Sequence, residues 1–252
     1  MTSKPPRGSA WRSLRRAAGR IPILGTAARY AWTKLNDLRF KTSGDYWEAR
    51  YAAGGNSGAG SYGRLAEWKA EILNALVRKH ALASVIEFGC GDGAQLALAR
   101  YPAYTGIDVA PSAVRLCIER FRDDATKSFF AIDPRAMRDP LGKLRADMAL
   151  SLDVLYHLVE DEVRDAYLER LFQAGSRFVV IFSSDGPSPT FGAAHERHRA
   201  FTPWVREHCP EWSLVEHIPN PYPMGNAGDD QQTSPADFFV FRRNASAAKE
   251  PS

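Results

Sequence analysis

Apolar and polar residues follow two different rhythms along the middle of the chain. Short apolar runs bounded by turn residues are typical of buried strands, whereas the stretches between them repeat their apolar residues every three to four positions, as helices do. Strands that alternate with helices form a parallel sheet covered by helices on both faces. The predicted strands are 84–88, 103–107, 127–132, 146–152 and 177–183, and the predicted helices are about 93–100, 111–122 and 160–174.

The pattern changes towards both ends of this region. Downstream, a helix is predicted from Thr202, and strands at 212–218 and 237–241 follow with no helix between them. Consecutive strands without a crossover helix pair antiparallel, so we predict a hairpin at the sheet edge. Upstream, an amphipathic helix at 64–80 follows an aromatic and glycine-rich stretch at 44–63. The expected fold is a Rossmann-like α/β sheet, mostly parallel, with helices on both faces and an antiparallel C-terminal hairpin.

Charge is distributed unevenly along the 252 residues. Residues 1–41 contain ten basic residues and one acidic residue, and the remainder contains 23 basic and 28 acidic residues. The net charge of +4 therefore combines an arm of +9 with a body of −5, and an acidic body argues against a nucleic-acid-binding core. We predict a basic arm over 1–41, one folded domain over 42–244 and a disordered tail over 245–252.

The basic arm has two interpretations. A helix predicted from Thr26 to about Phe40 gathers apolar residues on one face, which fits either contact with an anionic membrane surface or packing against the domain. Pro22, Gly25 and Arg29 interrupt any apolar segment of the kind that signal peptides contain. Three scattered cysteines favour a reducing compartment. We therefore expect a cytoplasmic protein whose membrane contact, if the arm makes one, is peripheral and at the inner face.

The segment Val85–Asp108 joins a strand, a glycine-rich turn, a helix and a second strand that ends in an acid. This is the opening unit of a nucleotide-binding sheet, in which the turn approaches the ligand and the acid binds ribose hydroxyls. Its glycines also fit the dinucleotide fingerprint. Glu87 favours another ligand, because a carboxylate is unfavourable beside a pyrophosphate but suits a cationic group on a ligand without phosphate, such as S-adenosylmethionine.

Three motifs resemble class I S-adenosylmethionine-dependent methyltransferases, namely E-F-G-C-G-D-G at 87–93, G-I-D-V-A-P-S-A-V at 106–114 and D-M-A-L-S-L-D-V-L-Y-H-L at 147–158. The resemblance covers roughly 45–242 and implies S-adenosylmethionine as the cofactor. It implies that the glycine turn holds the methionine end of the cofactor and that the acid after the second strand binds the ribose. It also implies that a residue after the third strand lies beside the adenine and that the stretch after the fourth strand lies under the cofactor. The cofactor-binding residues implied in this way are Glu87, Gly89, Cys90, Gly91, Asp108, Val109, Asp133 and Leu152.

Four further stretches are similar to a group of small bacterial methyltransferases that are associated with surface-glycan or secondary-metabolite assembly. This similarity fixes no acceptor. For the chain as a whole we predict O-methylation of a small-molecule or glycan hydroxyl, with no nucleic acid as partner. The stretches are G-G-N-S-G-A-G-S-Y-G at 54–63, L-S-L-D-V-L-Y-H-L-V-E-D at 150–161, H-E-R-H-R-A-F-T-P-W-V at 195–205 and S-P-A-D-F-F-V-F at 234–241.

An alcohol acceptor loses its proton during methyl transfer, so a base is expected on the loops at the carboxyl ends of the strands. His157 follows the fourth strand, and Asp153 precedes it by one helical turn, where it can orient the imidazole or contact the cofactor. His198, after the fifth strand, is the alternative base. Local capping or packing is the other interpretation of His157.

The segment H-E-R-H-R at 195–199 follows the fifth strand at the same end of the sheet. Arginine forks bind phosphate, carboxylate or uronate groups, so this segment suggests an anionic or polyhydroxy acceptor, and a solvated helix start is the alternative. No metal site is expected, because H-E-x-H lacks the i, i+4 spacing of metalloproteases and no cysteine lies nearby. The expected acceptor-binding residues are Tyr46, Tyr62, His195, Arg197 and Arg199.

Three other functions fit parts of the sequence. An NAD-dependent oxidoreductase would bind NAD instead of S-adenosylhomocysteine, and a non-catalytic domain would bind the cofactor without transferring a methyl group. A nucleic-acid or protein methyltransferase is disfavoured by the acidic body. It is disfavoured also because L-D-V-L at 152–155 stands where amino-methylating enzymes have N/D-P-P-Y/F.

Overall fold

The computed structural model describes residues 40–187, 193–224 and 233–245. The chain divides into two units, Met1–Phe40 and Lys41–Ser252, and the description below concerns the second. The predicted membrane-facing helix of the arm and the predicted tail beyond residue 245 lie outside the described residues. Within the described residues, no helix combines the length and the apolar character needed to cross a bilayer.

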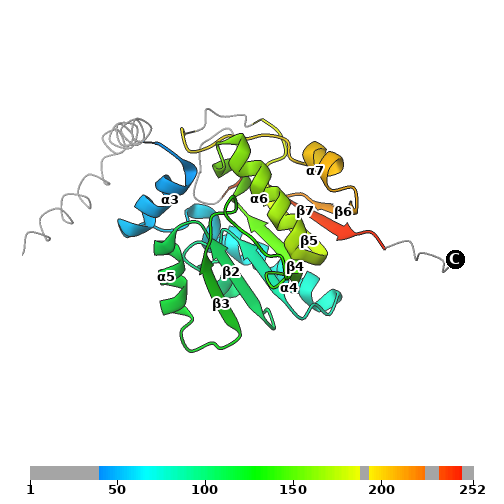
Figure 1. Cartoon of the computed structure of the whole chain (residues 1–252), viewed down its shortest axis with the longest axis horizontal. Helices are drawn as coiled ribbons and strands as arrows, with labels where there is room; N and C mark the ends of the chain where they lie inside the picture. Colours follow the sequence, from blue (N-terminus) through cyan, green and yellow to red (C-terminus); the bar gives the residue numbers. More distant parts are fainter. Residues whose placement is uncertain (1–39, 188–192, 225–232, 246–252) are drawn as a thin grey trace, which may run out of the picture. The chain divides into compact units, whose positions relative to one another are not determined.

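Seven strands form one sheet in the order β3-β2-β1-β4-β5-β7-β6 (Figure 1). The first five strands are parallel, and β7 runs antiparallel between β5 and β6, so the predicted fold class and the predicted C-terminal hairpin are confirmed. The strands are β1 (Val85–Phe88), β2 (Tyr104–Asp108), β3 (Lys127–Ala131), β4 (Ala146–Leu152), β5 (Gly175–Ser183), β6 (Trp212–Ile218) and β7 (Asp237–Arg243).

Helices connect the parallel strands and precede the sheet. Pro111 lies in the first turn of α5, where its missing N–H group would have had no helical partner. The helices are α3 (Ser43–Ala52), α4 (Gly63–Lys79), α5 (Pro111–Arg120), α6 (Asp161–Ala174) and α7 (Thr202–His208), with short 3-10 turns η1 (Ala59–Ser61), η2 (Leu96–Leu98) and η3 (Leu155–His157).

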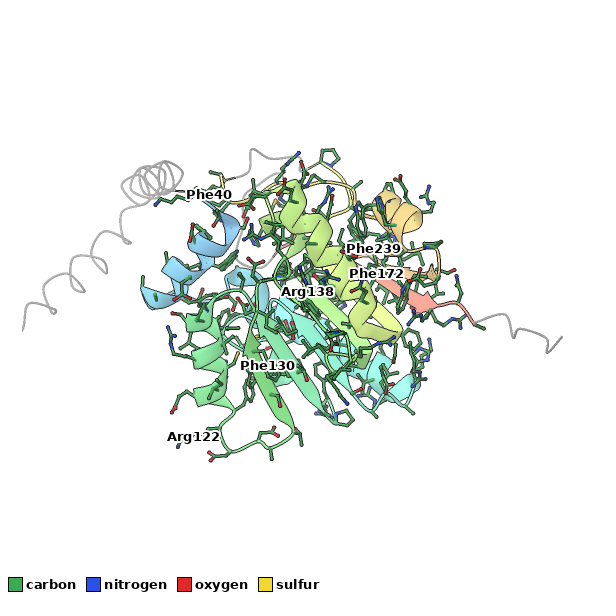
Figure 2. All side chains as sticks on the ribbon, viewed as in Figure 1. Phe40, Arg122, Phe130, Arg138, Phe172 and Phe239 are labelled. Atoms are coloured by element: carbon green, nitrogen blue, oxygen red, sulfur yellow. The ribbon has the colours of Figure 1, made fainter. Side chains whose placement is uncertain are left out.

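Alternate residues of each central strand face opposite helix layers, as the pleat of a strand requires. On β5, Val179 belongs to the apolar cluster that contains Phe172 of α6 and Phe239 of β7, and both phenylalanines are labelled in Figure 2. The next residue, Val180, packs instead in the cluster that contains Leu73 of α4. The sheet therefore separates two cores, with α6 in front of it and α4 behind it in Figure 1.

The helix predicted at 93–100 is wrong, since only the 3-10 turn η2 forms there. Gly93 has a left-handed backbone, with φ of +73°, which is incompatible with a helix start at that residue. The Asn74 side chain then binds the carbonyl of Leu98 and the N–H of Arg100, which a helix would have paired internally. Pro102 disfavours helical backbone at the residue before it.

The order of the strands in the sheet determines where a ligand site can open. After β1, the chain adds β2 and β3 on one side and then returns to place β4 on the other side of β1. The loops that follow β1 and β4 therefore diverge, and a crevice opens at their carboxyl ends. The hydroxyl of Tyr167 on α6 connects β1 to β4 at the base of the crevice. It donates a hydrogen bond to the Phe88 carbonyl of β1 and lies 2.8 Å from Ser151 Oγ of β4.

Replacing Tyr167 with phenylalanine is expected to lower the free energy of unfolding by about 1–3 kcal/mol, because the buried Phe88 carbonyl and Ser151 hydroxyl lose their partner. Urea denaturation measures the change. Ser151→Ala is the matched control, since the two residues share one hydrogen bond and the double variant should cost less than the two single changes added together. Strict additivity would contradict the hydrogen bond.

Candidate functional site

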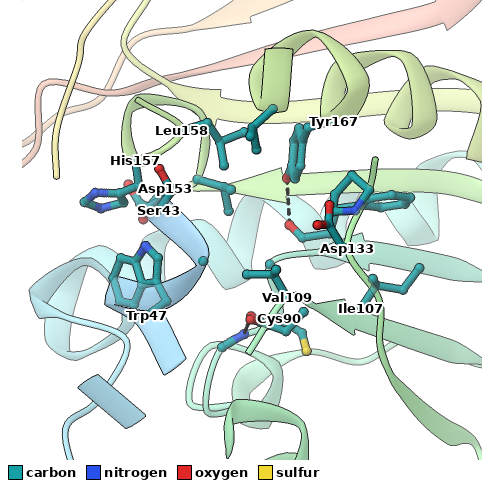
Figure 3. A pocket seen from close by; sticks show the side chains of 18 of the residues that line it. Ser43, Trp47, Cys90, Ile107, Val109, Asp133, Asp153, His157, Leu158 and Tyr167 are labelled. Atoms are coloured by element: carbon teal, nitrogen blue, oxygen red, sulfur yellow. Dashed lines mark hydrogen bonds between the residues drawn. The ribbon is translucent and has the colours of Figure 1, made fainter. Parts of the chain in front are cut away.

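A cavity of about 550 Å³ opens at the carboxyl ends of β1, β2 and β4, a volume typical of sites for small molecules. Figure 3 shows Trp47 and His157 at one end of it and Asp133 at the other. All eight cofactor-binding residues expected from the sequence line this cavity, although they come from four separate segments. They are Glu87, Gly89, Cys90, Gly91, Asp108, Val109, Asp133 and Leu152.

The glycine turn after β1 forms the floor of the cavity. Gly91 has a φ of +58°, and a Cβ atom there would overlap Ser57 Oγ, so no other residue fits without rearrangement. The carboxylate of Asp108 accepts hydrogen bonds of 2.9 Å from the N–H groups of Gly91 and Ala110. These bonds hold the turn against the end of β2 and leave Asp108 facing the cavity.

Glu87 is a buried carboxylate on the cavity wall. It accepts a 2.6 Å hydrogen bond from the Tyr104 hydroxyl, and among the described residues no ion pair involves it. Burial raises the pKa of Glu87 to about 7, while the hydrogen bond from Tyr104 acts in the opposite direction. A cationic ligand group in the cavity would offset this desolvation, whereas a phosphate would add repulsion.

Asp108 is a second buried carboxylate, and burial raises its pKa to about 6 against the lowering effect of its backbone hydrogen bonds. Asp133, at the far end, is held by Arg135, which lowers the pKa of its carboxyl group. The Cys90 thiol is buried beside Cys117, and both this contact and burial raise the pKa of Cys90, so it stays protonated and packs as a small residue.

Asp153 lies on the cavity wall with partners that the sequence did not indicate. Its carboxylate forms a 2.6 Å ion pair with Lys69 and accepts a 2.8 Å hydrogen bond from the Tyr156 hydroxyl. Its backbone is left-handed, with φ of +59°, so these bonds hold a strained residue in place. The expected orienting bond from Asp153 to His157 does not form, because the His157 Nδ1 atom faces the His195 carbonyl at 3.2 Å instead.

Lys69 was missed, although the sequence held a signal for it. It lies on the stripe of α4 that carries Leu65, Leu73 and Leu76, and its side chain is 1% exposed. Burying a lysine on an otherwise apolar helix face is costly unless its charge is paired, so its position predicts a carboxylate nearby.

His157 occupies the acceptor end of the cavity. Its ring contacts Trp47 edge-on at 4.9 Å between centroids and lies parallel to the His195 ring at 5.6 Å. Burial lowers the pKa of His157 to about 3, so the imidazole is neutral at physiological pH. His195 in turn stacks on Tyr46 at 4.1 Å, so three expected residues from distant segments meet here.

Of the expected catalytic and acceptor residues, only Asp153 and His157 line the cavity, so Tyr46 and His195 lie behind His157 and not on the cavity wall. The remaining four have other partners. His198 Nδ1 lies 2.7 Å from the Ser184 hydroxyl. Tyr62 donates to Asp92 at 2.6 Å. Arg197 forms a 3.2 Å ion pair with Asp161 at the start of α6. Arg199 also pairs with Asp161, so both guanidinium groups secure the loop after β5, and their role towards an acceptor stays a prediction.

Part of the chain matches the sequence model of a known protein family. Residues 86–180 match the sequence model of a family described as a methyltransferase domain. This part of the chain is similar to a methyltransferase domain. No curated protein sequence matches the chain. The match covers β1 to β5, which are the strands that carry every cofactor-side residue of the cavity.

Solved structures share the fold of this chain. The N-methyltransferase NodS from Bradyrhizobium japonicum WM9, in complex with S-adenosyl-L-homocysteine, is 18% identical with a TM-score of 0.61, covering 81% of this chain and all of NodS. The methyltransferase domain of bacterial CtHen1-C is 20% identical with a TM-score of 0.54, covering 71% and 98%.

Magnesium protoporphyrin IX methyltransferase from Synechocystis PCC 6803, with bound SAM, is 16% identical with a TM-score of 0.50, covering 71% of this chain and 79% of that enzyme. These likenesses identify the class I methyltransferase fold. Together with the family match they support S-adenosylmethionine as the cofactor, as the sequence predicted. The donors in the cavity fit it, because the buried Glu87 suits its cationic end and Asp108 suits ribose hydroxyls.

Replacing Glu87 with glutamine is expected to change how stability depends on pH. The folded pKa of about 7 exceeds the unfolded value of about 4.3, so the folded chain holds the extra proton and wild-type stability falls as pH rises between these values. Glu87→Gln should lack that component, as urea denaturation at several pH values would reveal. Glu207→Gln, at an exposed position of α7, is the matched control. Parallel pH curves for the wild type and Glu87→Gln would contradict the buried carboxyl group.

Proposed function

We propose that the chain is an S-adenosylmethionine-dependent methyltransferase that methylates a hydroxyl group of a small-molecule or glycan acceptor. One observation carries the proposal: a single cavity joins a buried carboxylate without a cationic partner, Glu87, to a neutral imidazole, His157. The first group suits a positively charged cofactor. The second suits an acceptor that must lose a proton.

When bound, S-adenosylmethionine supplies a methyl group already activated by a positively charged sulfur. The chain therefore has to align the acceptor and exclude water more than it has to activate the methyl carbon. Glu87 and Asp108 would hold the cofactor at the glycine turn, and Val109 and Asp133 would flank its adenine. Trp47 offers an apolar wall beside the acceptor end of the cavity.

His157 has the tautomer that an acceptor hydroxyl needs. Its Nδ1 atom can bond the His195 carbonyl only by donating a proton, so Nε2 keeps its lone pair. The acceptor hydroxyl would donate its hydrogen bond to Nε2 and be oriented by it. With the cofactor bound, the acceptor oxygen would take the methyl group from its sulfur, and His157 would take up the hydroxyl proton and pass it to solvent.

Related folds serve other acceptors, since NodS is named an N-methyltransferase and HEN1 a small RNA methyltransferase. For this chain a hydroxyl is favoured by the stretch after β4, where Leu152, Asp153, Val154 and Leu155 replace the N/D-P-P-Y/F signature of amino-methylating enzymes. The Asp153 carboxylate is also already neutralised by Lys69, so it is a poor partner for an amine acceptor.

Replacing Asp108 with alanine is expected to weaken binding of S-adenosylhomocysteine by about 1–3 kcal/mol, through lost ribose hydrogen bonds and a loosened glycine turn. Isothermal titration calorimetry measures this change. Asp123→Ala is the matched control, since the Asp123 side chain is 91% exposed and does not line the cavity. Unchanged affinity would remove Asp108 from the site, and binding of NAD without S-adenosylhomocysteine would favour an oxidoreductase.

Incubation with methyl-labelled S-adenosylmethionine and separate fractions of cell-envelope glycans, lipids and small metabolites is expected to label a hydroxyl as a methyl ether. The Asp108→Ala variant serves as the weakly active control. Labelling of RNA or protein would contradict the proposed acceptor class. Tight cofactor binding with no labelled fraction would instead favour a non-catalytic domain.

A further inference from the structure

Two histidines and a glutamate meet beside the acceptor end of the cavity. One imidazole nitrogen from each of His157 and His195 and one carboxylate oxygen of Glu196 lie within 4.8 Å of one another. Within the residues that the structure describes, no other group of three such ligands comes together in this way. Two imidazoles and one carboxylate are a common ligand set for a divalent transition-metal ion that keeps open coordination positions.

The surroundings of His157 match those of a metal-binding histidine. A ligating imidazole usually donates its second ring N–H to a backbone carbonyl, which fixes the ring and directs the other nitrogen at the metal. The His157 Nδ1 atom lies 3.2 Å from the His195 carbonyl and so makes this bond. Trp47 packs edge-on against the same ring and restricts its rotation.

The other two candidate ligands, His195 and Glu196, lie close to each other and can be reached from solvent. His195 Nε2 lies 3.8 Å from Glu196 Oε1 and 3.2 Å from the Tyr46 hydroxyl. Both side chains are partly exposed, His195 by 20% and Glu196 by 32%, which gives an ion a path from solvent. Movements of about 1–2 Å would bring the three ligand atoms to the spacing around a bound ion.

We propose that His157, His195 and Glu196 bind one divalent transition-metal ion beside the methyl-transfer cavity. This proposal replaces the expectation from the sequence that the chain has no metal site. That expectation compared only neighbouring residues, whereas His157 is 38 positions from His195 and joins it only in the folded chain.

The ion has a use that rests on the proposed function. An acceptor hydroxyl that fills an open coordination position is more acidic, because the ion stabilises its oxygen anion. The proton then leaves to solvent before the oxygen forms its bond to the methyl carbon, and the carbon–sulfur bond breaks with its electrons on sulfur. In the metal-loaded protein His157 would be a ligand, so its role as proton acceptor belongs to the metal-free protein alone.

The test uses the full chain, stripped of metal with a chelator and then titrated with Co²⁺, whose visible absorption reports ligand geometry. One equivalent of Co²⁺ is expected to bind with a tetrahedral or five-coordinate spectrum. His195→Ala and Glu196→Gln should each weaken binding at least about tenfold. His208→Ala is the matched control, because this histidine lies on α7 and contacts Trp204 instead.

Two measurements separate this inference from the proposed function. If His195→Ala and Glu196→Gln bind Co²⁺ like the wild type, or if His208→Ala is equally impaired, the metal site is wrong. Titration of the same proteins with S-adenosylhomocysteine reports on the cofactor cavity independently. Retained cofactor binding without the metal would overturn only the metal site, whereas metal binding without cofactor binding would overturn the proposed function.

Discussion

The Asp108 carboxylate joins the ends of two neighbouring strands through the N–H groups of Gly91 and Ala110. The rest of the site depends on this connection, because it holds the glycine turn in a left-handed path that brings backbone to the cavity floor. The turn is also fixed from above, where Ser57 and Asp92 exchange hydrogen bonds of 3.2 and 2.9 Å between side chains and backbone N–H groups. A side chain on the turn would separate these layers and fill the space that a cofactor needs.

The two carboxylates Asp153 and Glu87 of the cavity differ in whether an ion pair neutralises them, and this difference indicates which kind of ligand fits. Lys69 is almost fully buried and neutralises Asp153, so this pair contributes little net field. Glu87 lies on the same side of the sheet with only a hydroxyl for a partner. Burial raises the pKa of Glu87 and the charge of Lys69 acts to lower it, but the ion pair of Lys69 is with Asp153. A cofactor with a cationic end would give Glu87 an ion-pair partner of its own. This reasoning links a residue of β1 to the identity of the ligand without any appeal to the glycines.

The two ends of the cavity are built differently. The cofactor end is formed by short turns directly after strands, whose backbone the sheet fixes. The other end, where the acceptor is proposed to bind, is lined by Trp47 of α3 and His157 after β4, with Tyr46 and His195 packed around them. Loops of this kind vary more readily than the sheet, which explains how one fold supports acceptors as different as those named for the related structures. The proposed metal site belongs to this variable end.

Local pattern in the sequence determined most of the fold. All seven strands and the helices α4, α5 and α6 lie within two residues of their predicted bounds, because alternation and amphipathic periodicity are short-range properties of the chain. The helix expected at 93–100 failed, because its backbone bonds go to Asn74, a residue on another helix. The cofactor end was predictable for the same reason as the strands, since its residues directly follow them.

The sequence by itself determined the sheet, the glycine turn and a cofactor with a positive charge, because each depends on neighbouring residues. Only the tertiary structure decided the partners of the side chains. In the folded chain Asp153 pairs with Lys69 and Tyr156 instead of His157. Both arginines of the loop after β5 form ion pairs with Asp161. Apart from the bond between Asp153 and Tyr156, these contacts join residues 36 to 84 positions apart, and no spacing rule specifies such pairs before the chain has folded.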